Sequence, residues 1–136
     1  MHFLSSQTVK MYDTDAAGIL YFANQFRFAH DAFEELMASE GLSFQRLFDH
    51  EPYIFVIVHA ESDYFSSLKV GDGIQVKTWI SYIGESSFHI SYDVFKGEVL
   101  TGRAKTVHVC IGKASRAKQS LPDEIRALLN KYAVLG

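Results

Sequence analysis

The chain has 136 residues, of which 48% are hydrophobic and 14% aromatic, and its formal net charge is −3. This length and composition predict a single domain, residues 1–136, with enough apolar surface to form a substantial core. A slightly acidic chain without an evident basic face is not expected to bind nucleic acid. No apolar run approaches the ~20 residues that a membrane-spanning helix needs, so we expect no membrane partner.

The single cysteine, Cys110, lies inside an apolar run, which predicts a buried, unreactive thiol rather than a nucleophile. One cysteine cannot form an internal disulfide, and this fits a reducing compartment. The N-terminal stretch MHFLSSQTVK lacks a basic region followed by an apolar segment, so no secretory signal peptide is expected. We therefore expect a cytoplasmic protein.

The first part of the chain predicts a strand and then a long helix. Apolar residues in the stretch 3–11 follow a weak period of two, as in a strand. Further on, apolar residues recur at intervals of three and four, the pattern of one helix face. These residues are Phe22, Phe26, Ala29, Phe33, Leu36 and Met37. We predict a helix over about residues 23–40, with Asn24 as N-cap and Gly41 as left-handed stop. A short helical turn capped by Ser43 is expected next.

The second part of the chain predicts β-structure. Residues 53–58 are all apolar, as in a strand covered on both faces. Alternating apolar and polar residues predict further strands over 74–82, 88–94 and 99–111. Four or five antiparallel strands with one long helix on a sheet face indicate the α+β class. Pro122 begins a second, C-terminal helix, which we expect on the outside of the sheet or at a subunit contact.

The stretch YDTDAAGILYFAN, residues 12–24, joins the first predicted strand to the long helix. It carries two carboxylates, Asp13 and Asp15, just before the expected helix start. A carboxylate on a tight turn beside the free N–H groups of a helix start can act as base or nucleophile next to oxyanion donors. Asp is also common in ordinary turns and caps, so the residue types alone leave both interpretations open.

This stretch resembles the signature of hotdog-fold thioesterases of the 4-hydroxybenzoyl-CoA thioesterase type. The resemblance implies a hotdog fold, in which an antiparallel sheet wraps around one long central helix. It implies that Asp15 is the catalytic carboxylate, that Asp13 is its structural neighbour, and that the backbone N–H of Phe22 is the oxyanion donor. It also implies that no cofactor is needed, and that the protein is a homodimer or homotetramer with active sites between subunits.

The resemblance implies hydrolysis of an acyl-CoA thioester, with Asp15 either attacking the carbonyl or activating a water molecule. The stretches 28–35, 58–65 and 108–111 look like the branch that acts on 1,4-dihydroxy-2-naphthoyl-CoA, in menaquinone and phylloquinone synthesis. Alternative substrates are 4-hydroxybenzoyl-CoA and short or medium alkyl acyl-CoAs. An alternative of another class is a non-hydrolytic acyl-binding or dehydratase-like hotdog domain, in which His59 would pair with Glu61 or Asp63.

Further side chains are candidates for contacts with the substrate. Tyr21, near the helix start, could stack on a planar acyl group, and His30 and His59 could bind its ring hydroxyls. The CoA phosphates need cations near the pocket mouth. The candidates are Arg103, Lys105, Lys113, Arg116 and Lys118. No HExxH, CxxC or other histidine and cysteine cluster at ligand spacing is present, so we expect no metal site.

Overall fold

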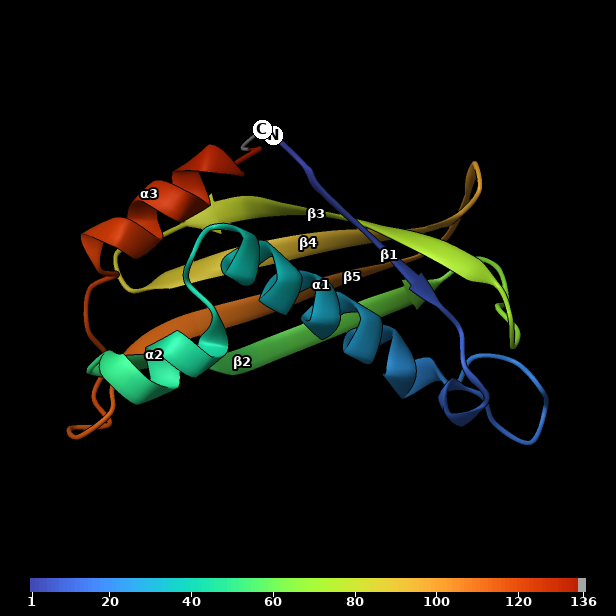
Figure 1. The fold of residues 1–136 in the computed structure, drawn as a ribbon, viewed down its shortest axis with the longest axis horizontal. Helices are drawn as coiled ribbons and strands as arrows, with labels where there is room; N and C mark the ends of the chain where they lie inside the picture. The colour runs from blue at the N-terminus through green and yellow to red at the C-terminus, as the bar shows by residue number, and fades with distance from the viewer. Residues whose placement is uncertain (135–136) are drawn as a thin grey trace.

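The computed structural model describes residues 1–134, which form a layer of helices on one antiparallel sheet (Figure 1). The strands are β1 (Phe3–Thr8), β2 (Tyr53–Tyr64), β3 (Gly73–Ile83), β4 (Ser87–Lys96) and β5 (Val99–Gly112). The α-helices within this range are α1 (Gln25–Ser39), α2 (Phe44–His50) and α3 (Asp123–Lys131). Two short 3₁₀ turns, η1 (Met11–Asp13) and η2 (Phe22–Asn24), precede α1. The predicted α+β class, with one long helix on a sheet face, is confirmed.

The strand order is β1-β3-β4-β5-β2, and every neighbouring pair is antiparallel. Short turns join β3 to β4 and β4 to β5, and Gly97 in the second turn has the positive φ of 61° that glycine tolerates. β2 therefore lies at one edge of the sheet and pairs only with β5 in the described chain. A bulge interrupts this pairing between Ile57 and His59.

The core lies between α1 and the sheet. The alternating residues of β3, β4 and β5 that face α1 are buried, as the period-two pattern predicted. Phe28, Phe33 and Leu36 of α1 are at most 1% exposed and meet this face. Cys110 is also buried, and burial raises the pKa of its thiol, in agreement with an unreactive cysteine.

The helix ends differ in detail from the predictions. Asn24 lies just before α1, but its side chain donates to the carbonyl of Asp13 at 3.0 Å instead of capping the helix. The reason is that η2 runs directly into α1, so Asn24 already has helical backbone angles. Gly41 has the predicted left-handed conformation, with φ of 75°, and Ser43 caps α2 by accepting from the N–H of Arg46.

Two further predictions are corrected. The first strand ends at Thr8 rather than at Met11, because Met11 begins η1, which the Asp13 carboxylate holds by accepting from the Lys10 N–H at 2.9 Å. The C-terminal helix α3 lies on the same sheet face as α1, not on the outside of the sheet, while its predicted place at a subunit contact stays a prediction. Its apolar stripe joins the common core, and Lys131 forms an ion pair with Glu40 at 2.7 Å. Within residues 1–134, no helix has the length and apolar character needed to cross a membrane.

Candidate active site

Asp13 is fully buried and is bound by cationic and backbone donors. The guanidinium of Arg27 donates to both of its carboxylate oxygens at 2.8 Å, and the Lys10 N–H donates at 2.9 Å. Its carbonyl accepts from the N–H of Tyr21 at 2.8 Å and from the side chain of Asn24. These contacts fasten the acidic turn to α1, so Asp13 has the structural position expected of it.

Asp15 has a different environment two residues later. Its side chain is exposed and accepts from the N–H of Ala17 at 2.9 Å, while its own backbone pairs with Ile19 and Gly18. Gly18 has a φ of 79°, which lets the chain reverse directly after the two alanines. Among residues 1–134, no Lys, Arg or His lies within ion-pair distance of the Asp15 carboxylate. Asp15 thus presents an unneutralised carboxylate.

This carboxylate borders a cleft of about 440 Å³ at the N-terminal end of α1. The walls come from the acidic turn, from η2 and from the end of β2 with the segment after it. The lining residues are Asp15, Ile19, Leu20, Phe22, Gln25, Tyr64, Phe65, Ser66, Ser67 and Leu68. The cleft therefore combines one carboxylate with largely apolar and aromatic walls, as ligand pockets commonly do.

Phe22 opens η2 at the cleft wall. Its carbonyl accepts a hydrogen bond from the Tyr64 hydroxyl. Its N–H is the first of the helical segment, and it has no acceptor among the described residues. An unpaired N–H at a helix start carries partial positive charge and can bind an oxyanion. Asp15 and Phe22, the carboxylate and the oxyanion donor that the resemblance implies, therefore border the same cleft.

Gln25 is a cleft residue that sequence reasoning missed. It is 1% exposed, and its amide donates to Ser62 Oγ at 2.6 Å and to the Asp63 carbonyl at 3.1 Å, which fixes the start of α1 against β2. The missed signal was a polar residue on the buried face of the predicted helix, three positions after Phe22. Ser66, Ser67 and Leu68 also line the cleft, although no site residue was predicted in that segment.

The candidate substrate residues are dispersed. Tyr21 is 43% exposed and packs against Phe22 with ring centroids 4.8 Å apart. His30 lies about one and a half turns into α1 and lines a second, smaller pocket. His59 lies on the sheet face away from α1, where its Nε2 is 3.0 Å from Glu61. His30 and His59 of one chain therefore do not share a cleft, because the bulge in β2 turns His59 outward.

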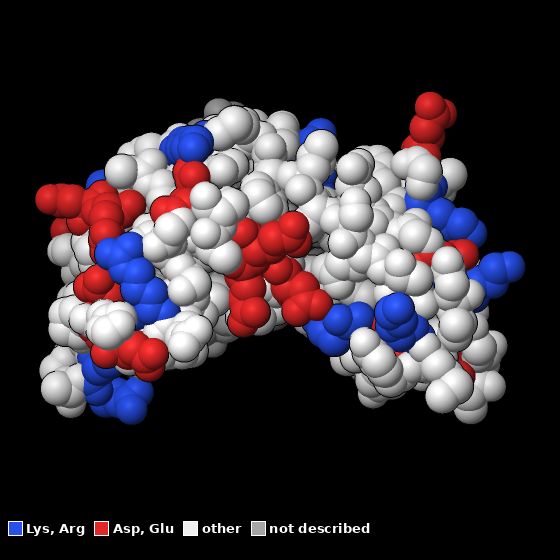
Figure 2. All heavy atoms as spheres, in the orientation of Figure 1, with Lys and Arg blue, Asp and Glu red and all other residues white. Residues whose placement is uncertain are grey.

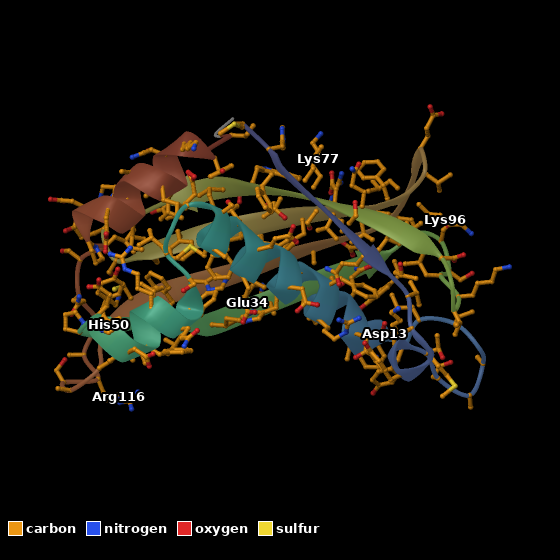
Figure 3. All side chains as sticks on the ribbon, viewed as in Figure 1. Asp13, Glu34, His50, Lys77, Lys96 and Arg116 are labelled. Carbon is orange, nitrogen blue, oxygen red and sulfur yellow. The ribbon has the colours of Figure 1, made fainter. Side chains whose placement is uncertain are left out.

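Two of the candidate CoA-binding cations are engaged within the chain. Arg103 pairs with Asp93 on the outer sheet face at 2.7 Å, which raises the pKa of the guanidinium, and Lys113 Nζ caps the carbonyl end of α2. Lys105, the neighbouring cation on β5, points to the same outer face. Arg116 and Lys118 lie in the loop after β5, and Figure 3 places Arg116 at the opposite end of the molecule from Asp13.

Figure 2 shows acidic side chains gathered over the middle of α1, where Figure 3 labels Glu34. This helix carries Asp31, Glu34 and Glu35 toward solvent, a surface that repels phosphates. We therefore do not expect CoA phosphates to bind on this face of α1. Within residues 1–134, no group of three or more His, Cys, Asp or Glu side chains has the arrangement of a metal site.

Comparison with known proteins places the chain in a family. The model of the thioesterase-like superfamily matches residues 9–129. The chain belongs to this superfamily. It is 41% identical to the 1,4-dihydroxy-2-naphthoyl-CoA hydrolase of Nostoc punctiforme over 92% of this chain and 84% of that protein. It is 37% identical to the 1,4-dihydroxy-2-naphthoyl-CoA hydrolase of Trichodesmium erythraeum over 97% and 98% of the two chains.

A solved member of the superfamily has the same fold. The crystal structure of a 1,4-dihydroxy-2-naphthoyl-CoA thioesterase from Synechocystis superposes with a TM-score of 0.89 at 31% identity, covering 96% of each chain. The hotdog arrangement that the Asp motif predicted, a sheet around one long helix, is thereby confirmed. The resemblance to hotdog-fold thioesterases is confirmed as well. The resemblance to the 1,4-dihydroxy-2-naphthoyl-CoA branch is also confirmed, because the similar proteins bear that name.

Proposed function

We propose that this superfamily member hydrolyses 1,4-dihydroxy-2-naphthoyl-CoA to the free acid and CoA. One observation carries the proposal: an unneutralised carboxylate, Asp15, borders the same apolar cleft as the unpaired N–H of Phe22. Support for the substrate comes from relatives at 30–41% identity that bear the corresponding name. We infer a cytoplasmic location, because an unpaired cysteine suits a reducing compartment.

Asp15 supplies the chemistry in this proposal. Its carboxylate either attacks the thioester carbonyl or removes a proton from the attacking water. The carbonyl oxygen becomes an oxyanion, and the N–H of Phe22 with the positive end of α1 stabilises it. The carbon–sulfur bond then breaks and CoA leaves as a thiolate. In the water route the acyl group is released directly as the carboxylic acid. In the nucleophilic route it forms a mixed anhydride with Asp15, which a water molecule hydrolyses to the free acid and the regenerated carboxylate. Losing one oxyanion donor typically costs ~10²–10³ in rate.

We further propose that two copies pair through the free edge of β2. This edge strand is 12 residues long, and its Ile57 and Val58 are 49% and 60% exposed. A long apolar edge with unpaired backbone groups is a template for another strand. A homodimer, alone or doubled to a tetramer, would cover it.

Such a dimer would also account for the position of the loop cations. The loop after β5 lies beside the start of β2, since the N–H of Lys113 donates to the Pro52 carbonyl at 2.9 Å. The Asp15 cleft includes Tyr64, at the end of β2. Antiparallel pairing of two β2 strands places the start of one beside the end of the other. Arg116 and Lys118 of one copy would then approach the cleft of the other and bind CoA phosphates.

Thiol release from a panel of CoA thioesters tests the function. The panel contains 1,4-dihydroxy-2-naphthoyl-CoA, 4-hydroxybenzoyl-CoA, benzoyl-CoA and straight-chain acyl-CoAs of several lengths. We expect the highest kcat/KM for the dihydroxynaphthoyl thioester. A preference for an alkyl thioester would leave a thioesterase with a different substrate, and an absence of thiol release from every member would support an acyl-binding domain.

A further inference from the structure

A second pocket lies in the groove between α1 and β2, beyond the Asp15 cleft. Its volume is about 160 Å³, and its walls come from α1, β2 and the sheet floor. The lining residues are Phe26, His30, Ile57, Ala60, Tyr92 and Thr106. Phe22 of the main cleft, Phe26 and His30 follow at intervals of four on one side of the helical segment. Phe26 is only four residues from Phe22, a helical rise of roughly 6 Å. A hydroxyl on the ring that carries the thioester carbonyl can therefore reach the second pocket while the carbonyl stays at the Phe22 N–H.

The floor of this pocket is the end of a buried chain of polar side chains. The Tyr92 hydroxyl lies 3.2 Å from Thr106 Oγ1, which lies 2.8 Å from Nε2 of His108. The three residues are 1%, 6% and 2% exposed. The His108 ring stacks on Phe88, with centroids 5.0 Å apart and planes 3° apart. A buried chain of polar side chains costs free energy unless each donor and acceptor in it has a hydrogen-bond partner. Because this chain ends at a pocket wall, we expect a ligand to supply the last partner.

All three groups of the chain are neutral at neutral pH. Burial, with a contribution from His30, lowers the pKa of His108 to about 4, and burial raises the pKa of Tyr92. A neutral imidazole has one N–H and one lone pair, and each hydroxyl both donates and accepts. The hydrogen bonds can therefore run in either direction along the chain. The phenol of Tyr92 can offer the pocket either its O–H or a free lone pair.

We propose that this pocket receives the edge of the acyl ring that carries the 4-hydroxyl, the same ring that bears the thioester carbonyl, and that the Tyr92–Thr106–His108 chain hydrogen-bonds that hydroxyl. The inference rests on the proposed function and names the side chains that set its substrate preference. A core cavity of ~150 Å³ accommodates one benzene molecule, so the pocket volume suits a single aromatic ring. A site built to bond a hydroxyl discriminates against analogues that lack it, because its own polar groups are then left unpaired.

The test compares two ligands that differ only in the 4-hydroxyl, 1,4-dihydroxy-2-naphthoyl-CoA and 1-hydroxy-2-naphthoyl-CoA. Binding is measured by calorimetry in the Asp15→Asn background, in which the thioesters stay intact. We expect the dihydroxy ligand to bind about 10- to 100-fold tighter. Tyr92→Phe should abolish most of this preference, and Thr106→Val, which interrupts the chain, should reduce it. Tyr82→Phe removes a half-exposed hydroxyl outside the pocket and should keep the preference.

Equal binding of the two ligands would overturn the inference, as would a Tyr92→Phe variant that keeps the full preference. If Tyr92→Phe does not fold, Thr106→Val decides by the same comparison. Thiol release by the unmodified protein tests the hydrolytic function separately. An active enzyme without hydroxyl preference overturns only the assignment of the pocket, whereas an inactive protein that retains the preference overturns only the hydrolysis.

Discussion

Arg27 binds both carboxylate oxygens of Asp13 at 2.8 Å, and this pairing separates the roles of the two acidic residues in the turn. Asp13 is neutralised and buried, so it holds the acidic turn on α1. Asp15 receives no such cation among residues 1–134 and borders the cleft. The two aspartates therefore differ in role because Arg27, fourteen residues after Asp13, pairs with Asp13 and leaves Asp15 free for the proposed chemistry.

Replacing Asp15 by Asn should remove the activity without unfolding the protein. The amide keeps the shape of the side chain and its acceptor for the Ala17 N–H, but it is neither nucleophile nor base. We expect kcat to fall at least roughly a thousandfold. Thiol release under single-turnover conditions measures the loss, and urea denaturation checks the fold. Activity within a few fold of the unmodified protein would rule out Asp15 as the catalytic carboxylate.

Replacing Asp13 by Asn should instead destabilise the protein. The change leaves the Arg27 guanidinium without its bidentate partner beside a fully buried side chain. We expect a loss of about 2–4 kcal/mol in the free energy of unfolding. The matched control is Asp31→Asn, which removes the more exposed partner of the same arginine and should cost less than about 0.5 kcal/mol. Equal costs for the two changes would contradict the structural role of Asp13.

Gly102 is predicted to be required for the position of Gln25. A Cβ built at Gly102 would lie 2.1 Å from Oε1 of Gln25, so alanine must displace the amide that joins α1 to β2. We expect Gly102→Ala to lower both the melting temperature and kcat/KM. Gly73→Ala is the control, because its Cβ would meet no atom within 4 Å. Crystal structures of both variants would show whether the Gln25 amide has moved, and an unmoved amide would refute the argument.

His108 should make stability fall as the pH falls. Its pKa is about 4 in the folded protein and 6.5 in the unfolded chain, so below pH 6.5 the unfolded state takes up a proton first. The contribution of the neutral His108 side chain to the free energy of unfolding is complete above pH 6.5 and is lost as the pH approaches 4. It amounts to about 3 kcal/mol. Urea denaturation across this range should give a shallower profile for His108→Gln. His50→Gln, at an exposed position, should keep the original slope.

The free edge of β2 should determine the oligomeric state. A lysine at Val58 places a charge on the exposed edge where a second strand would pair. We expect Val58→Lys to shift sedimentation toward a monomer and to raise KM for acyl-CoA, because the partner's loop cations are then lost. Val70→Lys introduces the same charge at a 51% exposed loop position and should change neither property. A monomeric unmodified protein with full activity would refute the proposed dimer.

The sequence by itself determined the elements and the acidic motif of this protein. Period-two and period-3.6 patterns record which face of each element is buried, so β3, β4, β5 and α1 were predicted close to their observed ends. The grouping of His59 with Glu61 and Asp63 on one strand face was correct for the same reason. The Asp motif was informative because its residues are adjacent in the chain.

Only the tertiary structure decided which groups meet. The pairing of Arg27 with Asp13, the anchoring of Gln25 to Ser62 and the chain from Tyr92 to His108 join residues 14, 37 and 16 positions apart. The bulge at residues 57–59 turned His59 away from His30. Such contacts depend on strand register and on how α1 lies across the sheet, and local periodicity carries information on neither.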